Sequence, residues 1–221
     1  MSAAVIFDLD GTLVDTPAGI VDALGGAVVD LGWPRPSTEE LRATIGRPMN
    51  EVLPELLGND DPDLLVAGIA AYRRLYEKNV LVRGEDLVFD GVVAGLTELR
   101  ARGVAVAIAT SKIQLTAAQT LDVAGLARFF DVVVCHDMVS RGKPYPDLAL
   151  AAAGRLGVDP ADCAMVGDTR YDIQVGVSAG MVPIGVSYGV GLTVDLLAAG
   201  AALVADTFAA VVASVADDAA A

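Results

Sequence analysis

The chain has 221 residues, of which 54% are apolar and 20% charged; this indicates a folded globular protein and excludes an intrinsically disordered one. Its formal net charge of −14 argues against nucleic acid and membrane surfaces as partners, because both require a basic face. The sequence has neither a signal-peptide pattern near its start nor an apolar run long enough for a transmembrane span, so we expect a cytoplasmic protein.

Short apolar runs that alternate with helical patterns predict a parallel sheet covered on both faces. The predicted strands are Ala4–Phe7, Val104–Ala109, Val132–Cys135, Cys163–Val166 and Pro183–Val186. Predicted helices include Val92–Leu99, a segment from Pro146 to about Leu156, and Val194–Ala199 with Thr193 as its cap. The fold class is therefore predicted to be α/β, with a doubly wound parallel sheet that forms a Rossmann-like core.

One long segment, from Thr16 to about Glu85, contains no convincing strand. Its helix-start signals are Thr16 before Pro17, the capping-box pair of Ser37 and Glu40, and Asp61 before Pro62. A purely helical stretch of this length does not suit a single crossover between strands. We therefore expect an inserted helical cap domain of residues 16–85 and an α/β core of residues 1–15 and 86–221. The end of the chain, from about Ser214, is expected to be loosely ordered.

Polar clusters follow the predicted strands at their carboxyl ends. The first contains Asp8 and Asp10, whose side chains point the same way on an extended chain, so a cation or a proton must relieve their repulsion. The later clusters are Thr110-Ser111-Lys112, Gly142-Lys143-Pro144 and Gly167-Asp168-Thr169 with Asp172. Ligands bind at the carboxyl edge of open α/β sheets, so these clusters predict one shared site.

The ordered motifs D-x-D-G-T, a strand ending in Thr, Lys-Pro and G-D-x-x-x-D resemble those of the haloacid dehalogenase-like phosphatases over almost the whole chain. The segments V-D-T, A-T-S-K, K-P-Y-P and Y-G-V-G resemble the phosphoglycolate phosphatase branch. The resemblance implies a Mg²⁺-dependent phosphatase that hydrolyses a small, phosphoglycolate-like phosphate monoester through an aspartyl-phosphate intermediate. The expected partner is a small phosphorylated metabolite, and the sequence does not indicate an oligomeric state.

The resemblance also assigns the reacting groups and the metal ligands. Asp8 is the expected nucleophile, and Asp10 the expected general acid and then general base. Asp8, the backbone carbonyl of Asp10, and Asp168 are the expected Mg²⁺ ligands, with Asp172 completing or supporting the set. Hard oxygen ligands of this kind suit Mg²⁺, and the metal would offset the negative field of the chain.

The remaining candidates bind the substrate. The resemblance implies that Thr110 and Lys143 hold the phosphoryl oxygens, and Lys143 adds a positive point charge there. Ser111 and its neighbour Lys112 are kept only as further candidates for binding. Arg47 lies in an expected turn between two helices, where it would pair with a carboxylate or second phosphate of the substrate if it faces the sheet. His136, the only histidine, is interpreted as a surface or loop residue.

Other activities fit the same motifs less well. A phosphomutase acting on sugar phosphates would also use Asp8, but Thr12 favours hydrolysis. A pyrophosphatase or 5′-nucleotidase on the same scaffold shares much of the pattern. Asp10 argues against a dehalogenase and against phosphonate cleavage, and four intact motifs argue against a non-catalytic binding module.

Overall fold

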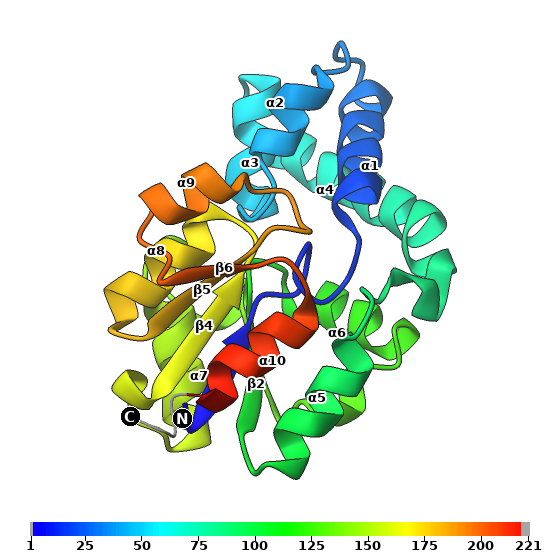
Figure 1. Cartoon of the computed structure of the whole chain (residues 1–221). Coiled ribbons are helices and arrows are strands. Elements are labelled where there is room, and N and C mark those ends of the chain that lie inside the picture. Colours follow the sequence, from blue (N-terminus) through cyan, green and yellow to red (C-terminus); the bar gives the residue numbers. More distant parts are fainter. Residues whose placement is uncertain (1, 218–221) are drawn as a thin grey trace.

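The computed structural model describes residues 2–217 and has a six-stranded parallel sheet at its centre (Figure 1). The strands are β1 (Ala4–Phe7), β2 (Ala105–Thr110), β3 (Val132–Cys135), β4 (Cys163–Gly167), β5 (Val182–Val186) and β6 (Leu203–Ala205). Their order is β3-β2-β1-β4-β5-β6, so the winding direction reverses at β1. The predicted α/β fold with a doubly wound sheet is confirmed, and only the short strand β6 was not predicted.

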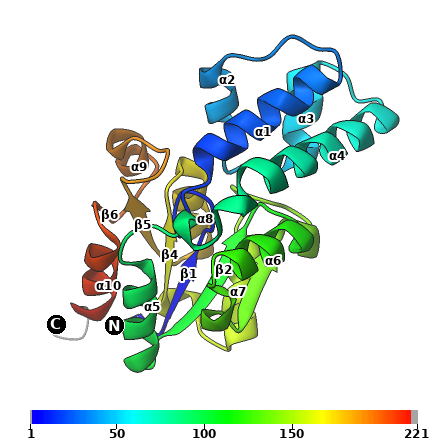
Figure 2. The ribbon, with the colours of Figure 1, turned by 90° about the vertical axis from the view of Figure 1, so that its right-hand side faces the viewer.

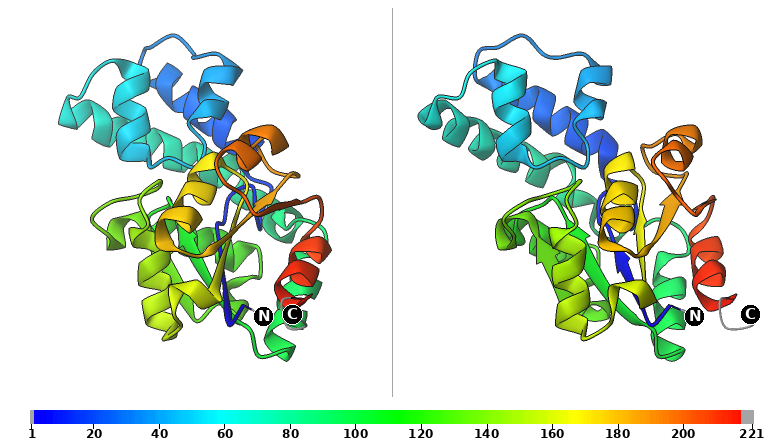
Figure 3. Two further views of the ribbon diagram at one scale, coloured as in Figure 1. Left: turned by 60° about the vertical axis from the view of Figure 1, so that its left-hand side comes forward. Right: turned by 90° about the vertical axis from the view of Figure 1, so that its left-hand side faces the viewer.

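Helices cover both faces of the sheet (Figure 3). On one face, α7 (Asp147–Leu156) and α8 (Arg170–Ala179) contact the central strands; α5 (Val92–Ala101) and α10 (Phe208–Asp217) lie on the other. The remaining core helices are α6 (Gln114–Val123), α9 (Thr193–Ala198) and the 3₁₀ turns η2 (Ala127–Phe129), η3 (His136–Met138) and η4 (Pro160–Asp162). In β1, Ile6 packs under α7 while Phe7 faces the opposite core, so the continuous apolar strand serves two layers.

A second group of helices lies above the carboxyl ends of the strands (Figures 1 and 2). It consists of α1 (Pro17–Asp30), α2 (Thr38–Ala43), α3 (Met49–Leu57), α4 (Pro62–Asn79) and the 3₁₀ segment η1 (Leu81–Leu87). The two segments that connect these helices to the sheet lie side by side, because Val14 and Val88 form an antiparallel bridge. The amide of Asp15 donates to the carbonyl of Leu87 at 2.7 Å beside this bridge.

The helix ends confirm some of the expected caps and correct others. Ser37 and Glu40 form the predicted capping box, and Asp61 caps α4. Thr16 does not cap α1, because its hydroxyl donates to the charged carboxylate of Asp10, which is the stronger acceptor. Likewise, Thr193 is already within α9 and does not cap it.

The chain end and the membrane prediction can be compared with the described residues. Helix α10 continues to Asp217, so the expectation of loose order from Ser214 was wrong up to that point, and residues 218–221 lie outside the described part. Among residues 2–217, no helix combines the length and the apolar character that crossing a membrane requires.

Candidate active site

Three carboxylates meet where β1 and β4 end. Asp8 directly follows β1, Asp168 directly follows β4, and Asp172 lies in the first turn of α8. Each offers an oxygen, and these oxygens all lie within 4.8 Å of one another. The grouping follows from the topology, since β1 and β4 are neighbours and their carboxyl ends share one edge of the sheet. All three side chains are buried.

Two loops hold Asp168 in this cluster. Thr12 donates its hydroxyl to Oδ1 of Asp168 at 3.3 Å, and the amide of Val190 donates to Oδ2 at 2.8 Å. Gly11 has a φ of +76°, and a Cβ atom at this position would overlap the Asp168 carboxylate. The glycine of the first motif is therefore required both for the backbone turn and for the close approach of Asp168.

Lys143 is the cation at the centre of the cluster, and its side chain is fully buried. Its Nζ lies 2.7 Å from Oδ1 of Asp8 and 2.5 Å from Oδ1 of Asp172. Oδ2 of Asp172 accepts hydrogen bonds from the backbone amide of Thr169 at 2.9 Å and from its hydroxyl at 2.6 Å. Both oxygens of Asp172 are thus engaged by the protein, and this carboxylate fixes the position of Lys143.

The negative charge of the cluster is poorly accommodated by the protein alone. Burial raises the pKa of Asp8 to about 7; Lys143 opposes this shift, while Asp172 and Asp10 add to it. Burial and the neighbouring Asp172 also raise the pKa of Asp168 well above its usual value. Because an ionised carboxylate in a buried site needs compensation, a further positive charge near these two groups would stabilise their ionised forms.

The donor set fits a magnesium ion. Mg²⁺ prefers carboxylate and carbonyl oxygens, and Asp8 and Asp168 supply two carboxylates on adjoining strands. Oδ1 of Asp8 is buried and makes no hydrogen bond of normal geometry within residues 2–217, although Lys143 lies close to it. A metal bound here would share the Asp8 carboxylate with Lys143.

Asp10 is held by two partners that the sequence motifs did not identify. Thr16 donates to its Oδ1 at 2.5 Å, and Nζ of Lys112 lies 3.0 Å from its Oδ2. Lys112 also lies over the ring of Tyr76, 4.2 Å from the centroid. Burial alone would lower the pKa of Lys112, but Asp10, Tyr76 and Tyr72 together outweigh burial and raise that pKa above the usual value. Lys112 is therefore a charged partner of Asp10 and more than a neighbour of Thr110.

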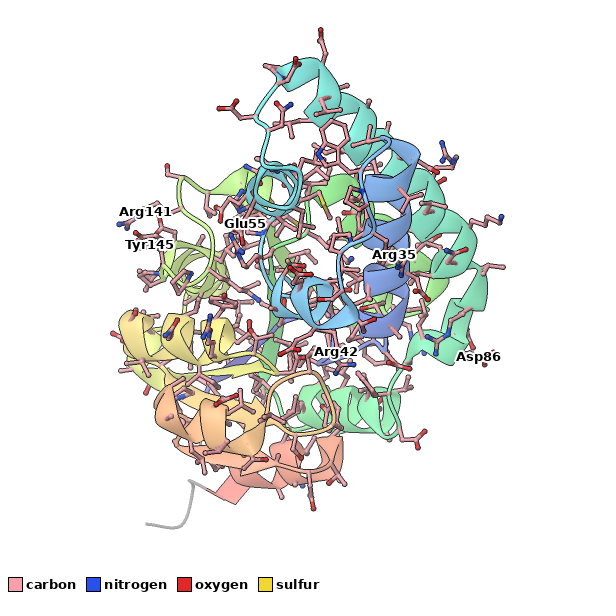
Figure 4. All side chains as sticks on the ribbon, turned by 90° about the horizontal axis from the view of Figure 1, so that it is seen from above. Arg35, Arg42, Glu55, Asp86, Arg141 and Tyr145 are labelled. Carbon is pink, nitrogen blue, oxygen red and sulfur yellow. The ribbon has the colours of Figure 1, made fainter. Side chains whose placement is uncertain are left out.

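The three remaining candidates line a cavity next to this cluster. Thr110 is buried at the end of β2, where its hydroxyl accepts a hydrogen bond from the amide of Lys112 at 3.2 Å. Ser111 donates to the carbonyl of Gly46 at 2.6 Å and so joins the core to the turn that carries Arg47. Arg47 does reach the cavity, but its guanidinium is paired at 2.7 Å with Glu55, which is labelled in Figure 4.

The cavity has a volume of about 140 Å³ and lies between the strand ends and helices α1, α3 and α4. Asp8, Asp10, Thr110, Ser111 and Lys112 line its polar side. His136 also lines it, so the interpretation of this residue as a surface or loop residue missed its place beside the site. The only sequence signal was that His136 directly follows β3, at the same edge of the sheet.

Replacing Asp8 with Asn is expected to stabilise the metal-free protein at pH 8. With a folded-state pKa of about 7 and an ordinary value of 3.8, folded Asp8 keeps a proton that the unfolded chain releases, so the free energy of unfolding falls as the pH rises between these values. Asn lacks this charge, so we expect a gain of up to about 4 kcal/mol at pH 8, because the two pKa values differ by about 3, and less than half of that gain at pH 5. Thermal melts in EDTA at both pH values measure this difference.

A control for this prediction is Asp60→Asn, which neutralises an exposed carboxylate between α3 and α4. Because Asp60 is solvated, its variant should melt close to the wild type at both pH values. A lower melting temperature of Asp8→Asn at pH 8 would show that Asp8 is stabilised as an anion by the protein itself.

Known proteins resemble the chain over most of its length. Residues 5–186 match the family model described as haloacid dehalogenase-like hydrolase. A protein of Dickeya dadantii named "Probable phosphatase IndB" is 44% identical over 200 residues, covering 90% of this chain and 87% of that protein. A protein of Thiobacillus denitrificans named "Phosphoglycolate phosphatase" is 32% identical over 191 residues, covering 84% of this chain and 83% of the relative.

A solved structure has the same architecture. The crystal structure of a hydrolase from Pseudomonas syringae superposes with a TM-score of 0.86 at 27% identity and covers 99% of each chain. The family that the sequence motifs resemble is thus confirmed, as is the likeness to proteins of the phosphoglycolate phosphatase branch. The chain belongs to the haloacid dehalogenase-like hydrolase family.

Proposed function

We propose that the protein is a Mg²⁺-dependent phosphatase that hydrolyses a small phosphate monoester through an aspartyl-phosphate on Asp8. One observation carries this proposal: Asp8 lies at the end of the central strand β1, beside buried Lys143 and within 4.8 Å of the other cluster carboxylates. Relatives named as phosphatases support the reaction class. Those named "Phosphoglycolate phosphatase" make phosphoglycolate the first physiological ester to test.

In the first half-reaction, a carboxylate oxygen of Asp8 attacks phosphorus, and the ester bond to the leaving alcohol breaks. Asp10 donates a proton to the leaving oxygen. Thr16 and Lys112 hold the two oxygens of Asp10 at 2.5 and 3.0 Å, so this carboxyl group is fixed toward the cavity. Lys143 and Thr110 bind the phosphoryl oxygens and stabilise the charge that spreads over them.

In the second half-reaction, water attacks the phosphorus of the aspartyl-phosphate. Asp10, now ionised, takes a proton from this water, and the bond between phosphorus and Asp8 breaks to release inorganic phosphate. The carboxylate of Asp8 is regenerated. Forming the covalent intermediate divides one difficult hydrolysis into two easier displacements.

Asp8, Asp168 and the backbone carbonyl of Asp10 would hold Mg²⁺, with Asp172 supporting the site through Lys143. When bound, the ion supplies positive charge that lets a buried acidic cluster accept a phosphate dianion. The division into an α/β core and an inserted cap of residues 16–85 belongs to the same proposal. In this view, the cap closes the cavity over the substrate and excludes bulk water, apart from the water that attacks the intermediate.

The test is phosphate release from p-nitrophenyl phosphate by the purified protein. With Mg²⁺ we expect steady turnover, and EDTA should abolish it until Mg²⁺ is added back in excess. A matched control titrates Ca²⁺ in place of Mg²⁺, since a larger and less strictly octahedral ion should support much less turnover. Turnover that EDTA does not reduce would contradict the proposed Mg²⁺ dependence. Conversion of a sugar 1-phosphate to the 6-phosphate without phosphate release would identify a mutase instead.

A further inference from the structure

The cavity beside Asp8 and Asp10 has walls that are mostly apolar. They come from α1, the turn before α3, α3 itself and α4, and include Leu24, Ile45, Met49, Val52, Ile69 and Tyr72. Leu24 and Val52 are 1% exposed and belong to the packed core behind the wall, whereas Met49 and Ile69 are only half-buried. A substrate whose phosphoryl group lies at the polar side of the cavity would place its leaving alcohol against this wall.

The cations on the cavity wall are largely neutralised already. Lys112 is paired with Asp10 at 3.0 Å and Arg47 with Glu55 at 2.7 Å. Arg73 of α4 also lines the cavity, is only partly buried, and has no carboxylate partner among residues 2–217. A carboxylate on the substrate would therefore lose its hydration against apolar side chains with only Arg73 as a free counter-charge.

On the basis of the phosphatase function proposed above, we propose that the preferred substrate is a phosphate monoester whose leaving alcohol is uncharged and carries a compact apolar group. The cavity of about 140 Å³ also has to hold the phosphoryl group at its polar side, so the apolar group beside it is a small one. An engineered closed cavity of about 150 Å³ in another protein holds benzene alone, so this partly open cavity suits a phosphoryl group joined to one small ring or a short branched chain that reaches its open side. Phosphoglycolate, with its carboxylate, matches these walls poorly.

Three esters of primary alcohols test this preference, namely benzyl phosphate, ethyl phosphate and phosphoglycolate, each assayed for phosphate release with Mg²⁺. We expect kcat/KM for benzyl phosphate to exceed that for ethyl phosphate by about tenfold or more, because the ring is removed from water against the apolar wall. Phosphoglycolate is expected to be no better than ethyl phosphate. A higher kcat/KM for phosphoglycolate than for benzyl phosphate would overturn the inference.

A pair of variants on α4 tests whether the wall causes the preference. Ile69 lines the cavity, whereas Val66, one turn earlier, is 67% exposed and does not. Ile69→Lys should lower kcat/KM for benzyl phosphate about tenfold and improve the relative rate with phosphoglycolate, while Val66→Lys should leave the order of the three esters unchanged. If Ile69→Lys does not fold, the milder Ile69→Ala should still reduce the ratio of benzyl to ethyl phosphate.

Arg73→Gln tests the alternative hypothesis that the cavity prefers a substrate with a carboxylate. If Arg73 recognises a substrate carboxylate, the wild type should prefer phosphoglycolate and this variant should lose that preference through a higher KM, which would overturn the inference while leaving the phosphatase intact. If the apolar wall decides, Arg73→Gln should change the three esters alike. Absence of turnover with all three esters and with p-nitrophenyl phosphate would instead show that the proposed phosphatase function has failed, and the inference with it.

Discussion

Asp8→Asn is expected to abolish turnover of p-nitrophenyl phosphate, reducing kcat by about 10⁴-fold or more, as is usual when a covalent nucleophile is removed. An amide oxygen does not attack phosphorus, and none of the neighbouring groups replaces it: Asp172 is bonded to Lys143 and Thr169, and Asp168 to Thr12 and Val190. Phosphate release under saturating Mg²⁺ measures the effect. Turnover that survives in this variant would show that the nucleophile has been assigned to the wrong residue.

Asp10→Asn is the informative partner of this variant. It retains the nucleophile, and p-nitrophenolate is a good leaving group that needs little proton donation, so the first half-reaction should survive. The second half-reaction needs Asp10 as a base, so we expect a burst of p-nitrophenol of about one equivalent per enzyme followed by slow turnover. The expected thermal stabilisation of Asp8→Asn in EDTA excludes misfolding as the reason for its inactivity.

The sheet was predictable because its strands are almost continuous apolar runs that need no long-range information. Ala4–Phe7 is buried along its whole length, and its residues alternate between two cores. Strand β6 escaped prediction because it has only three residues within an Ala-rich stretch. The prediction of Thr16 as a helix cap was wrong because local sequence does not show that the charged oxygen of Asp10 is the competing acceptor.

The polar centre of the site was predictable for a topological reason, and its surroundings were not. Asp8 and Asp168 directly follow strands of one parallel sheet and Thr110 ends another, and this alone places them at one edge. The role of Lys112 depends on Tyr76, which comes from a helix far away in the sequence. The apolar wall also depends on contacts between distant segments. Its residues on α1, α3 and α4 resemble ordinary core residues in the sequence, and only the folded structure shows that they line a cavity.

Lys143→Met should both inactivate and destabilise the protein. The variant leaves Asp8 and Asp172 buried near each other without the cation that lies 2.7 and 2.5 Å from them. Removing one partner of a buried charge pair costs about 3–5 kcal/mol, and loss of a group that stabilises the transferring phosphoryl charge costs about 10²–10³-fold in kcat. Urea denaturation in EDTA and phosphate release with Mg²⁺ measure the two effects separately.

The matched control is Arg141→Met, two residues earlier on the same loop. Arg141 is 57% exposed in its side chain, pairs with Asp147 at 2.9 Å and lies beside Tyr145 on the outside of the molecule (Figure 4). A surface pair of this kind contributes at most about 1 kcal/mol, so this variant should keep its activity and nearly all its stability.

The double variant Lys143→Met with Asp172→Asn separates the effect of Lys143 on stability from its effect on kcat. Neutralising Asp172 removes the repulsion that Lys143 had balanced, so much of the lost stability should return while kcat stays low, because the phosphoryl oxygens still lack their cation. Wild-type turnover in either Lys143 variant would contradict the role given to this lysine. Recovery of turnover together with stability would mean that Lys143 only balances the charge of Asp172, and that Thr110 and the metal suffice to hold the phosphoryl group.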